Sequence, residues 1–286
     1  MSDVQKVIRY FATAFAILLA VGIITGIVSL VLVIVNGVSG ENISIGHADK
    51  KTVDFSKSFT DQVESLDIEN SAGELKIMQG ETFKVEATKV SEDFEARVNE
   101  EGKLIVSDDH RGFHFLWFNF NGFHNTNSKV TVYIPADFIA DEARIDTGAG
   151  NVSLEGLQAD YLYISAGAGN INGDDITAGD VKIDGGVGNV TLDEVDFTDV
   201  DLDCGVGNLN INGKLLGKTK IDCGVGEVEL NLSGSTKDYG FDIDSGIGSV
   251  KLNGEKLKES DYYNQDAENI IKVDGGIGNV KINMEE

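Results

Sequence analysis

Residues 183–192 read IDGGVGNVTL and residues 202–211 read LDCGVGNLNI, two versions of one phrase set 19 positions apart. The phrase also begins at Ile145, Ile164 and Ile221, always with the same period. A fixed period over this many copies is typical of stacked supersecondary units that pack only against their neighbours. The sequence therefore predicts a repeat array.

Each copy contains two alternating segments joined by a Gly-x-Gly bend. Apolar and polar residues alternate before the bend, as Ile183 and Asp184 do, and this is the period of a β-strand. With the segment after the bend and a further apolar pair, each coil offers three inward-facing segments. We therefore predict an all-β fold, a parallel β-solenoid with coils of about 19 residues. A tight corner with positive φ favours glycine, and the second glycine of the bend is found at Gly150, Gly169, Gly188, Gly207, Gly226, Gly248 and Gly278.

An apolar stretch near the start of the chain predicts a single transmembrane helix over residues 10–36. The 26 residues from Tyr10 to Val35 carry no charge. As a helix they would span about 39 Å, enough to cross a hydrocarbon core of about 30 Å. A cleaved secretory signal is the alternative, but its apolar region is usually only about 7–15 residues long.

The charges that flank this stretch predict its orientation. Lys6 and Arg9 precede it, whereas the first charge after it is Glu41. The positive-inside rule then places the N-terminus in the cytoplasm. We expect a single-pass protein of the cell membrane that contacts the lipid bilayer through residues 10–36 and carries its C-terminal domain outside the cytoplasm.

The remaining sequence is divided by how clearly the repeat can be read. A fainter copy, LDIENSAGELKI, begins at Leu66 and is followed by further strand-like segments. The predicted parts are a cytoplasmic tail at 1–9, the transmembrane helix at 10–36, a stalk at 37–60, an N-terminal cap with the first coils at 61–140, and the glycine-repeat solenoid at 141–286.

The composition limits the partners that the chain can bind. A formal net charge of -25 disfavours nucleic acid and anionic surfaces, because both would be repelled. A basic or neutral partner fits better. The chain has 34 glycines but only two cysteines, too few for a fold held together by several disulfides. The stacking of coils must therefore supply most of the stability.

With its Gly-x-Gly repeat, the SAGEL copy and the strand KVTVYIPADF, the chain resembles the bacterial "putative adhesin" β-strand-repeat family, whose function is unknown, and LiaG-like membrane-anchored proteins. The resemblance covers roughly residues 60–286 and rests on a repeated motif. It implies a parallel β-solenoid on the outer face of the cell envelope. It supplies no catalytic residues.

The two cysteines occupy equivalent sites on adjacent coils. Cys204 and Cys223 are one period apart, and stacked strands would bring their Cα atoms to about 4.8 Å, within disulfide range. A bridge and two buried free thiols both remain open. The equivalent residues in other coils are all small, which indicates an inward corner: Thr147, Ala166, Gly185, Ser245 and Gly275.

A column of aspartates just before each bend is the candidate cation site. Asp184, Asp203 and Asp222 stand at equivalent positions, and like charges repeated at about 4.8 Å repel one another by about 0.9 kcal/mol per pair even in water. Backbone N–H groups of the next turn could offset this repulsion. Calcium is the other possibility, but Val190 stands where a β-roll calcium motif has aspartate. We expect no dedicated metal site and no cofactor.

One segment, residues 110–124, breaks the repeat with consecutive large apolar residues. It either caps the open end of the solenoid or forms a contact surface. The candidate contact residues are Phe115, Trp117, Phe118 and Phe120.

No nucleophile–base pair or carboxylate cluster stands outside the repeat, which predicts a protein that is not an enzyme. The leading hypothesis is a membrane-anchored extracytoplasmic adhesin or envelope-interaction protein whose partner is an envelope protein or polysaccharide, with no role for nucleic acid. The alternative is a regulatory protein that senses envelope stress and acts through a membrane partner.

Overall fold

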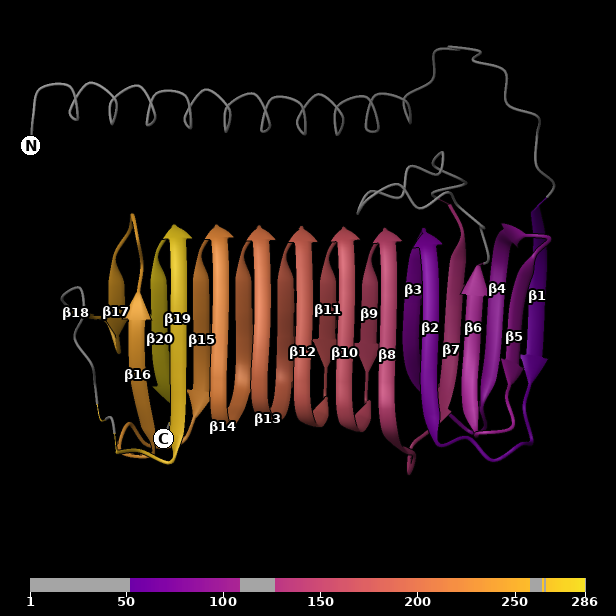
Figure 1. Cartoon of the computed structure of the whole chain (residues 1–286), viewed down its shortest axis with the longest axis horizontal. Helices are drawn as coiled ribbons and strands as arrows, with labels where there is room; N and C mark the ends of the chain where they lie inside the picture. The colour runs from indigo at the N-terminus through magenta and orange to yellow at the C-terminus, as the bar shows by residue number, and fades with distance from the viewer. Residues whose placement is uncertain (1–51, 109–126, 258–263, 265, 286) are drawn as a thin grey trace, which may run out of the picture. The chain divides into compact units, whose positions relative to one another are not determined.

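The computed structural model describes residues 52–108, 127–257, 264 and 266–285, and these contain 20 β-strands. The strands belong to one compact unit, Lys51–Glu286. Nothing in the described part of the chain is a helix of the length and apolar character needed to cross a bilayer. The predicted span at residues 10–36 lies outside the described residues. The fold is all-β and solenoid-like, and the strands stand side by side in a row (Figure 1).

Hydrogen bonds join the strands into two ladders that are continuous through the bends of β13 and β14. The long-strand ladder contains, in spatial order, β5 (Phe94–Val98), β6 (Lys103–Asp108), β2 (Ser65–Ala72), β8 (Ile139–Ala149), β10 (Gln158–Ala168), β12 (Thr177–Val187), the second parts of β13 (Val190–Val206) and β14 (Leu209–Val225), β19 (Asn269–Ile277) and β16 (Tyr239–Asp244).

The short-strand ladder contains, in the same direction, β1 (Thr52–Ser58), β4 (Lys84–Ser91), β7 (Lys129–Pro135), β3 (Glu74–Gly80), β9 (Val152–Glu155), β11 (Ile171–Asp174), the first parts of β13 and β14, β15 (Val228–Ser233), β20 (Val280–Glu285), β17 (Val250–Leu252) and β18 (Glu255–Leu257).

The 19-residue period of the sequence is the register of these ladders. Ile164 on β10 pairs in parallel with Ile145 on one side and with Ile183 on the other. All three side chains are fully buried. The long strands bend where two exposed residues, Asp160 and Tyr161, follow each other and shift the alternation. Each coil therefore buries three apolar segments, as the sequence predicts.

The order of coils in space differs from their order in the chain at both ends of the array. Strand β2 lies between β6 and β8. The chain therefore places β6 on one side of β2 and later places β8 on the other side. Strand β19 lies between β14 and β16 (Figure 1). The coil that comes last in the sequence is therefore the second-to-last coil in space. Segments that interrupt the period allow these crossings.

Antiparallel strands finish both ends of the short-strand ladder. Strand β1 pairs antiparallel with β4, and β17 with β18. Polar and charged side chains on such edge strands hinder further strand addition.

The stalk predicted over 37–60 is too long, because residues 52–58 form β1. There Phe55 packs edge-on against Phe94, with 5.1 Å between ring centroids, and this contact holds the edge strand on the domain.

Candidate interaction surface

The Gly-x-Gly corner joins each long strand to the following short strand. At Gly188 φ is +151°, and a Cβ atom would lie 1.9 Å from the carbonyl oxygen of Gly169 in the preceding coil. Six of the seven predicted corner glycines have positive φ. Gly248 does not, but a Cβ there would lie 1.6 Å from the carbonyl oxygen of Gly278. The close approach of neighbouring coils requires glycine at this position.

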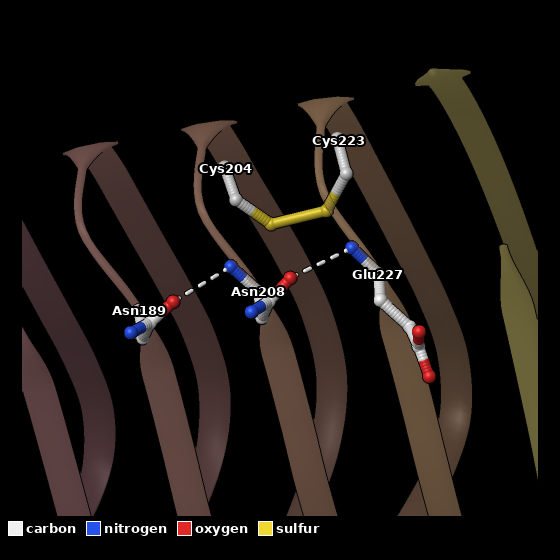
Figure 2. Close-up of a disulfide and its surroundings, with 5 residues drawn as sticks. All are labelled: Asn189, Cys204, Asn208, Cys223 and Glu227. Atoms are coloured by element: carbon white, nitrogen blue, oxygen red, sulfur yellow. Dashed lines mark hydrogen bonds between the residues drawn. A yellow bond between two sulfur atoms is a disulfide. The ribbon is translucent and has the colours of Figure 1, made fainter. Parts of the chain in front are cut away.

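Inside the corner, a disulfide joins Cys204 of β13 to Cys223 of β14 (Figure 2). Their Cα atoms are 4.6 Å apart, and both residues are buried. Since 19 positions separate the two residues, closing this loop in the unfolded chain should stabilise the fold by about 3 kcal/mol in the chain-entropy model. The bridge therefore fastens two central coils in register.

Beside the corner, asparagines that recur every 19 residues form a ladder. The side-chain oxygen of Asn189 accepts a hydrogen bond from the backbone N–H of Asn208 at 2.9 Å, and Asn208 accepts one from the N–H of Glu227 at 3.0 Å (Figure 2). Asn151 and Asn170 continue the same pattern. These amides satisfy backbone donors at the bend, so their role is structural.

The outer face of the long-strand ladder carries the aspartate column. Asp184, Asp203 and Asp222 pair in register on β12, β13 and β14. Asp184 lies 3.9 Å from Lys182, and Asp222 forms an ion pair with Lys220. Similar pairs join Arg144 to Asp146 and Lys272 to Asp274. Cations two residues earlier on the same strand therefore neutralise most of the column.

Two strands depart from this arrangement, because β13 holds Asp201 where β12 and β14 hold lysine, and β16 holds Asp242 where β19 holds Lys272. Desolvation raises the pKa of the Asp203 carboxyl, and nearby carboxylates raise it further. The contributing carboxylates are those of Asp222, Asp201 and Asp184. The described residues contain no group of three potential ligand side chains placed to hold a metal ion.

The same face carries a cluster of aromatic and guanidinium groups that we call the Tyr–Arg patch, formed by Arg144, Tyr161 and Tyr163. The Arg144 guanidinium lies 4.4 Å from the centre of the Tyr163 ring. The Tyr163 hydroxyl donates a hydrogen bond to Asp184 at 3.2 Å. Tyr161 is 36% exposed, and Tyr163 is half-buried. These residues lie on adjacent strands, β8 and β10.

The corner also exposes a row of aliphatic side chains that sequence reasoning missed. They are the middle residues of five bends, Val187, Val206, Val225, Ile277 and Ile247. The signal was present in the sequence as an apolar residue between two glycines. We call this row the aliphatic ridge.

The predicted contact residues Phe115, Trp117, Phe118 and Phe120 lie outside the described residues. The choice between a cap and a contact surface for that segment therefore stays a prediction. The Tyr–Arg patch and the aliphatic ridge are candidate contact surfaces among the residues that the structure describes.

Solved bacterial structures resemble the chain at low sequence identity. A "putative cell adhesion protein" from Clostridium sporogenes is 19% identical, with a TM-score of 0.35, over 82% of this chain and 100% of that one. A "putative adhesin" from Bacteroides fragilis is 15% identical, with a TM-score of 0.40, over 82% and 98%. A "putative lipid binding protein" from Parabacteroides distasonis is 12% identical, with a TM-score of 0.40, over 82% and 97%.

A search of curated proteins finds no match. The model of the Toastrack DUF4097 family, in contrast, matches residues 63–268, which include most of both ladders. The chain belongs to the Toastrack DUF4097 family.

Proposed function

We propose that this chain is a non-enzymatic envelope-interaction protein, anchored in the cell membrane by residues 10–36, that binds a partner outside the cytoplasm through the Tyr–Arg patch. The observation that carries the proposal is the exposed Tyr161 and the half-buried Tyr163 beside Arg144 on a sheet that is hydrogen-bonded on both sides. Tyrosine and arginine are enriched where protein interfaces gain most of their binding energy.

The surroundings of the patch favour a basic or neutral partner. Arg144 forms an ion pair with Asp146 at 2.8 Å, and the Tyr163 hydroxyl donates a hydrogen bond to Asp184. Carboxylates therefore surround the aromatic rings of the patch. The net charge of the whole chain, -25, acts in the same direction. An anionic polymer would be repelled over about one Debye length.

The rigidity of the ladder supports a role in contact. Strand β10 is hydrogen-bonded on both sides, to β8 and to β12, so both tyrosines stand on a strand that cannot easily move. Such a surface loses little conformational entropy when it binds. Extended side faces of repeat arrays are commonly used in this way.

Photo-crosslinking in intact cells tests the proposal. A photoreactive phenylalanine analogue replaces Tyr161 in the full chain, and a second variant carries the same analogue at Tyr133, which stands half-buried on the short-strand ladder. We expect an adduct with an envelope component at position 161 and at least fivefold less at position 133. Equal adducts at both positions, or none at either, would contradict the assignment of the patch.

The anchor has a separate test. Deleting residues 10–36 should release the chain from the membrane fraction. If the shortened chain still sediments with membranes, the proposed anchor is wrong, whatever the crosslinking shows.

A further inference from the structure

The aliphatic ridge runs along the corner of five neighbouring coils. Its residues are 36% to 71% exposed and follow one another in space as Val187, Val206, Val225, Ile277 and Ile247. Their exposed area is about 400 Å², comparable with the largest apolar patch of a typical monomer, which is often functional. Glycines flank each ridge residue on both sides, so the side chains project without neighbours on their own strand.

The corner does not require these bulky residues. Ala149 and Ala168 occupy the same position in the two preceding coils, where the backbone follows the same path. A β-branched residue favours extended backbone, but threonine would provide the same branching with a polar group. Neither the fold nor local propensity therefore explains why five exposed positions are valine or isoleucine.

We propose that the aliphatic ridge binds the ridge of a second copy of this chain. The two strands that carry Cys204 and Cys223 are 4.6 Å apart at their Cα atoms, and the ridge repeats at this coil spacing. Five side chains spaced in this way interdigitate along their full length only with a surface of the same period. A second copy supplies that surface.

The electrostatics of the corner permit this contact between two acidic chains. Asp184, Asp203 and Asp222 stand three residues before their ridge residues, on the outer face of the long strands. On the other side stand the uncharged Asn189 and Asn208. Glu227 occupies the position equivalent to these asparagines after Val225, and its carboxylate forms an ion pair with Lys281.

The exposed area of the ridge limits the affinity expected for a contact between two copies. Two ridges together would bury about 800 Å², below the roughly 1,200–2,000 Å² of stable complexes. The contact should therefore be weak between freely diffusing chains. It becomes populated when the membrane anchor of the proposed function raises the effective concentration of the two copies.

Cysteine crosslinking of the full chain in its own membrane tests the proposal. Val225→Cys places a thiol at the middle of the ridge, and Lys214→Cys places one on the same strand, away from the corner, where the lysine side chain is 54% exposed. The native cysteines are bridged, so a short bis-maleimide reacts with the new thiol. We expect at least fivefold more covalent dimer from Val225→Cys than from Lys214→Cys.

A second variant separates a specific contact from chance collision. Adding Val206→Ser and Ile277→Ser to Val225→Cys removes apolar groups from exposed positions, which should leave folding intact and reduce the dimer at least fivefold. Equal dimer from the two single variants, no dimer, an adduct with another protein only, or a dimer insensitive to the two serines would overturn the proposal. Membrane fractionation is read in the same samples, so a chain that is absent from the membrane is recognised as a failure of the anchor instead.

Discussion

The middle of the β domain and its two ends use the same coil but assemble it differently. From β8 to β15 each coil follows the previous one in sequence and in space, and residues pair with those 19 positions away, except that Val195 to Thr198 pair with residues 18 positions away. At the ends, the coil of β2 and β3 lies between two coils that follow it in the chain, and the coil of β19 and β20 lies between two that precede it.

The difference shows that the end of the chain is not the end of the array. Strand β20 is hydrogen-bonded to β15 on one side and to β17 on the other, so the last strand is an interior strand. Chain termini usually fray because one side is free. Here the edge strands β1, β5 and β18 are antiparallel to their neighbours and β16 is parallel to β19, whereas β20 is held on both sides.

Removing the last coil should have the largest effect. A chain that stops before β19 loses the strands that join β14 to β16 and β15 to β17, so β16 to β18 lose the partners that hold them to the array. We expect them to unfold and to be cut by protease soon after Ser233. Limited proteolysis with mass spectrometry measures this.

Deletion of residues 52–58 is the matched control, because β1 pairs only with β4 among the described strands. This deletion should leave the protease pattern of the repeat unchanged. Continued protection of β16 to β18 in the first variant would mean that this coil can stack directly on β14 and β15, and the distinction between ends and middle would then fail.

A corner glycine of the middle should be far more sensitive than a turn glycine of the end. In Gly188→Ala the new Cβ meets a backbone oxygen at 1.9 Å that a parallel ladder holds in place. We expect the free energy of unfolding to fall by more than about 4 kcal/mol, or the array to open locally. Gly254, between β17 and β18, has φ of +81° but nothing within 4 Å.

In Gly254→Ala only the backbone conformation is strained, so the expected loss is about 1 kcal/mol. Chemical denaturation of both variants gives the comparison. Similar losses would show that the close approach of coils at the corner is relieved by a small backbone shift.

The sequence predicted the middle of the molecule well because the period there is uninterrupted. The repeat at Ile145, Ile164 and Ile183 predicted a buried column, and the same period placed Cys204 and Cys223 on adjacent coils. The insertion of β19 could not be predicted, because Val273 pairs with Ile221 across 52 positions and no period connects them. Strand order at the ends depends on how a loop crosses the array, and local patterns do not record this.

The candidate surfaces also differ in how far the sequence predicted them. The aspartate column followed from the repeat, but the patch of Tyr161, Tyr163 and Arg144 did not. Arg144 and Tyr163 occupy the repeat position that holds Lys182 and Lys220 in later coils, so the patch depends on which side chain each coil carries there and on the register between β8 and β10. Repetition identifies what is shared by all coils, whereas a binding site is formed by what differs between them.

The smallest expected effect tests whether the central coils are equivalent to one another. Asp203 lacks the cation that its neighbours have, and the raised pKa of its carboxyl means that the charged form opposes folding at neutral pH. Asp203→Asn should therefore increase the free energy of unfolding at pH 7, by only a few tenths of a kcal/mol because the side chain is exposed. Asp222→Asn removes the ion pair with Lys220 and should give no gain.

The pH dependence identifies the cause. Above the raised pKa of Asp203 the wild-type carboxylate is charged in both states, and the variant keeps its advantage. As pH falls below the usual aspartate pKa of about 3.9, the carboxyl is protonated in the folded and the unfolded chain, so the advantage should vanish. Urea denaturation of both proteins at pH 7 and pH 3 measures it. An advantage that persists at pH 3 would assign the gain to packing or hydrogen bonding, and coil β13 would then be electrostatically equivalent to its neighbours.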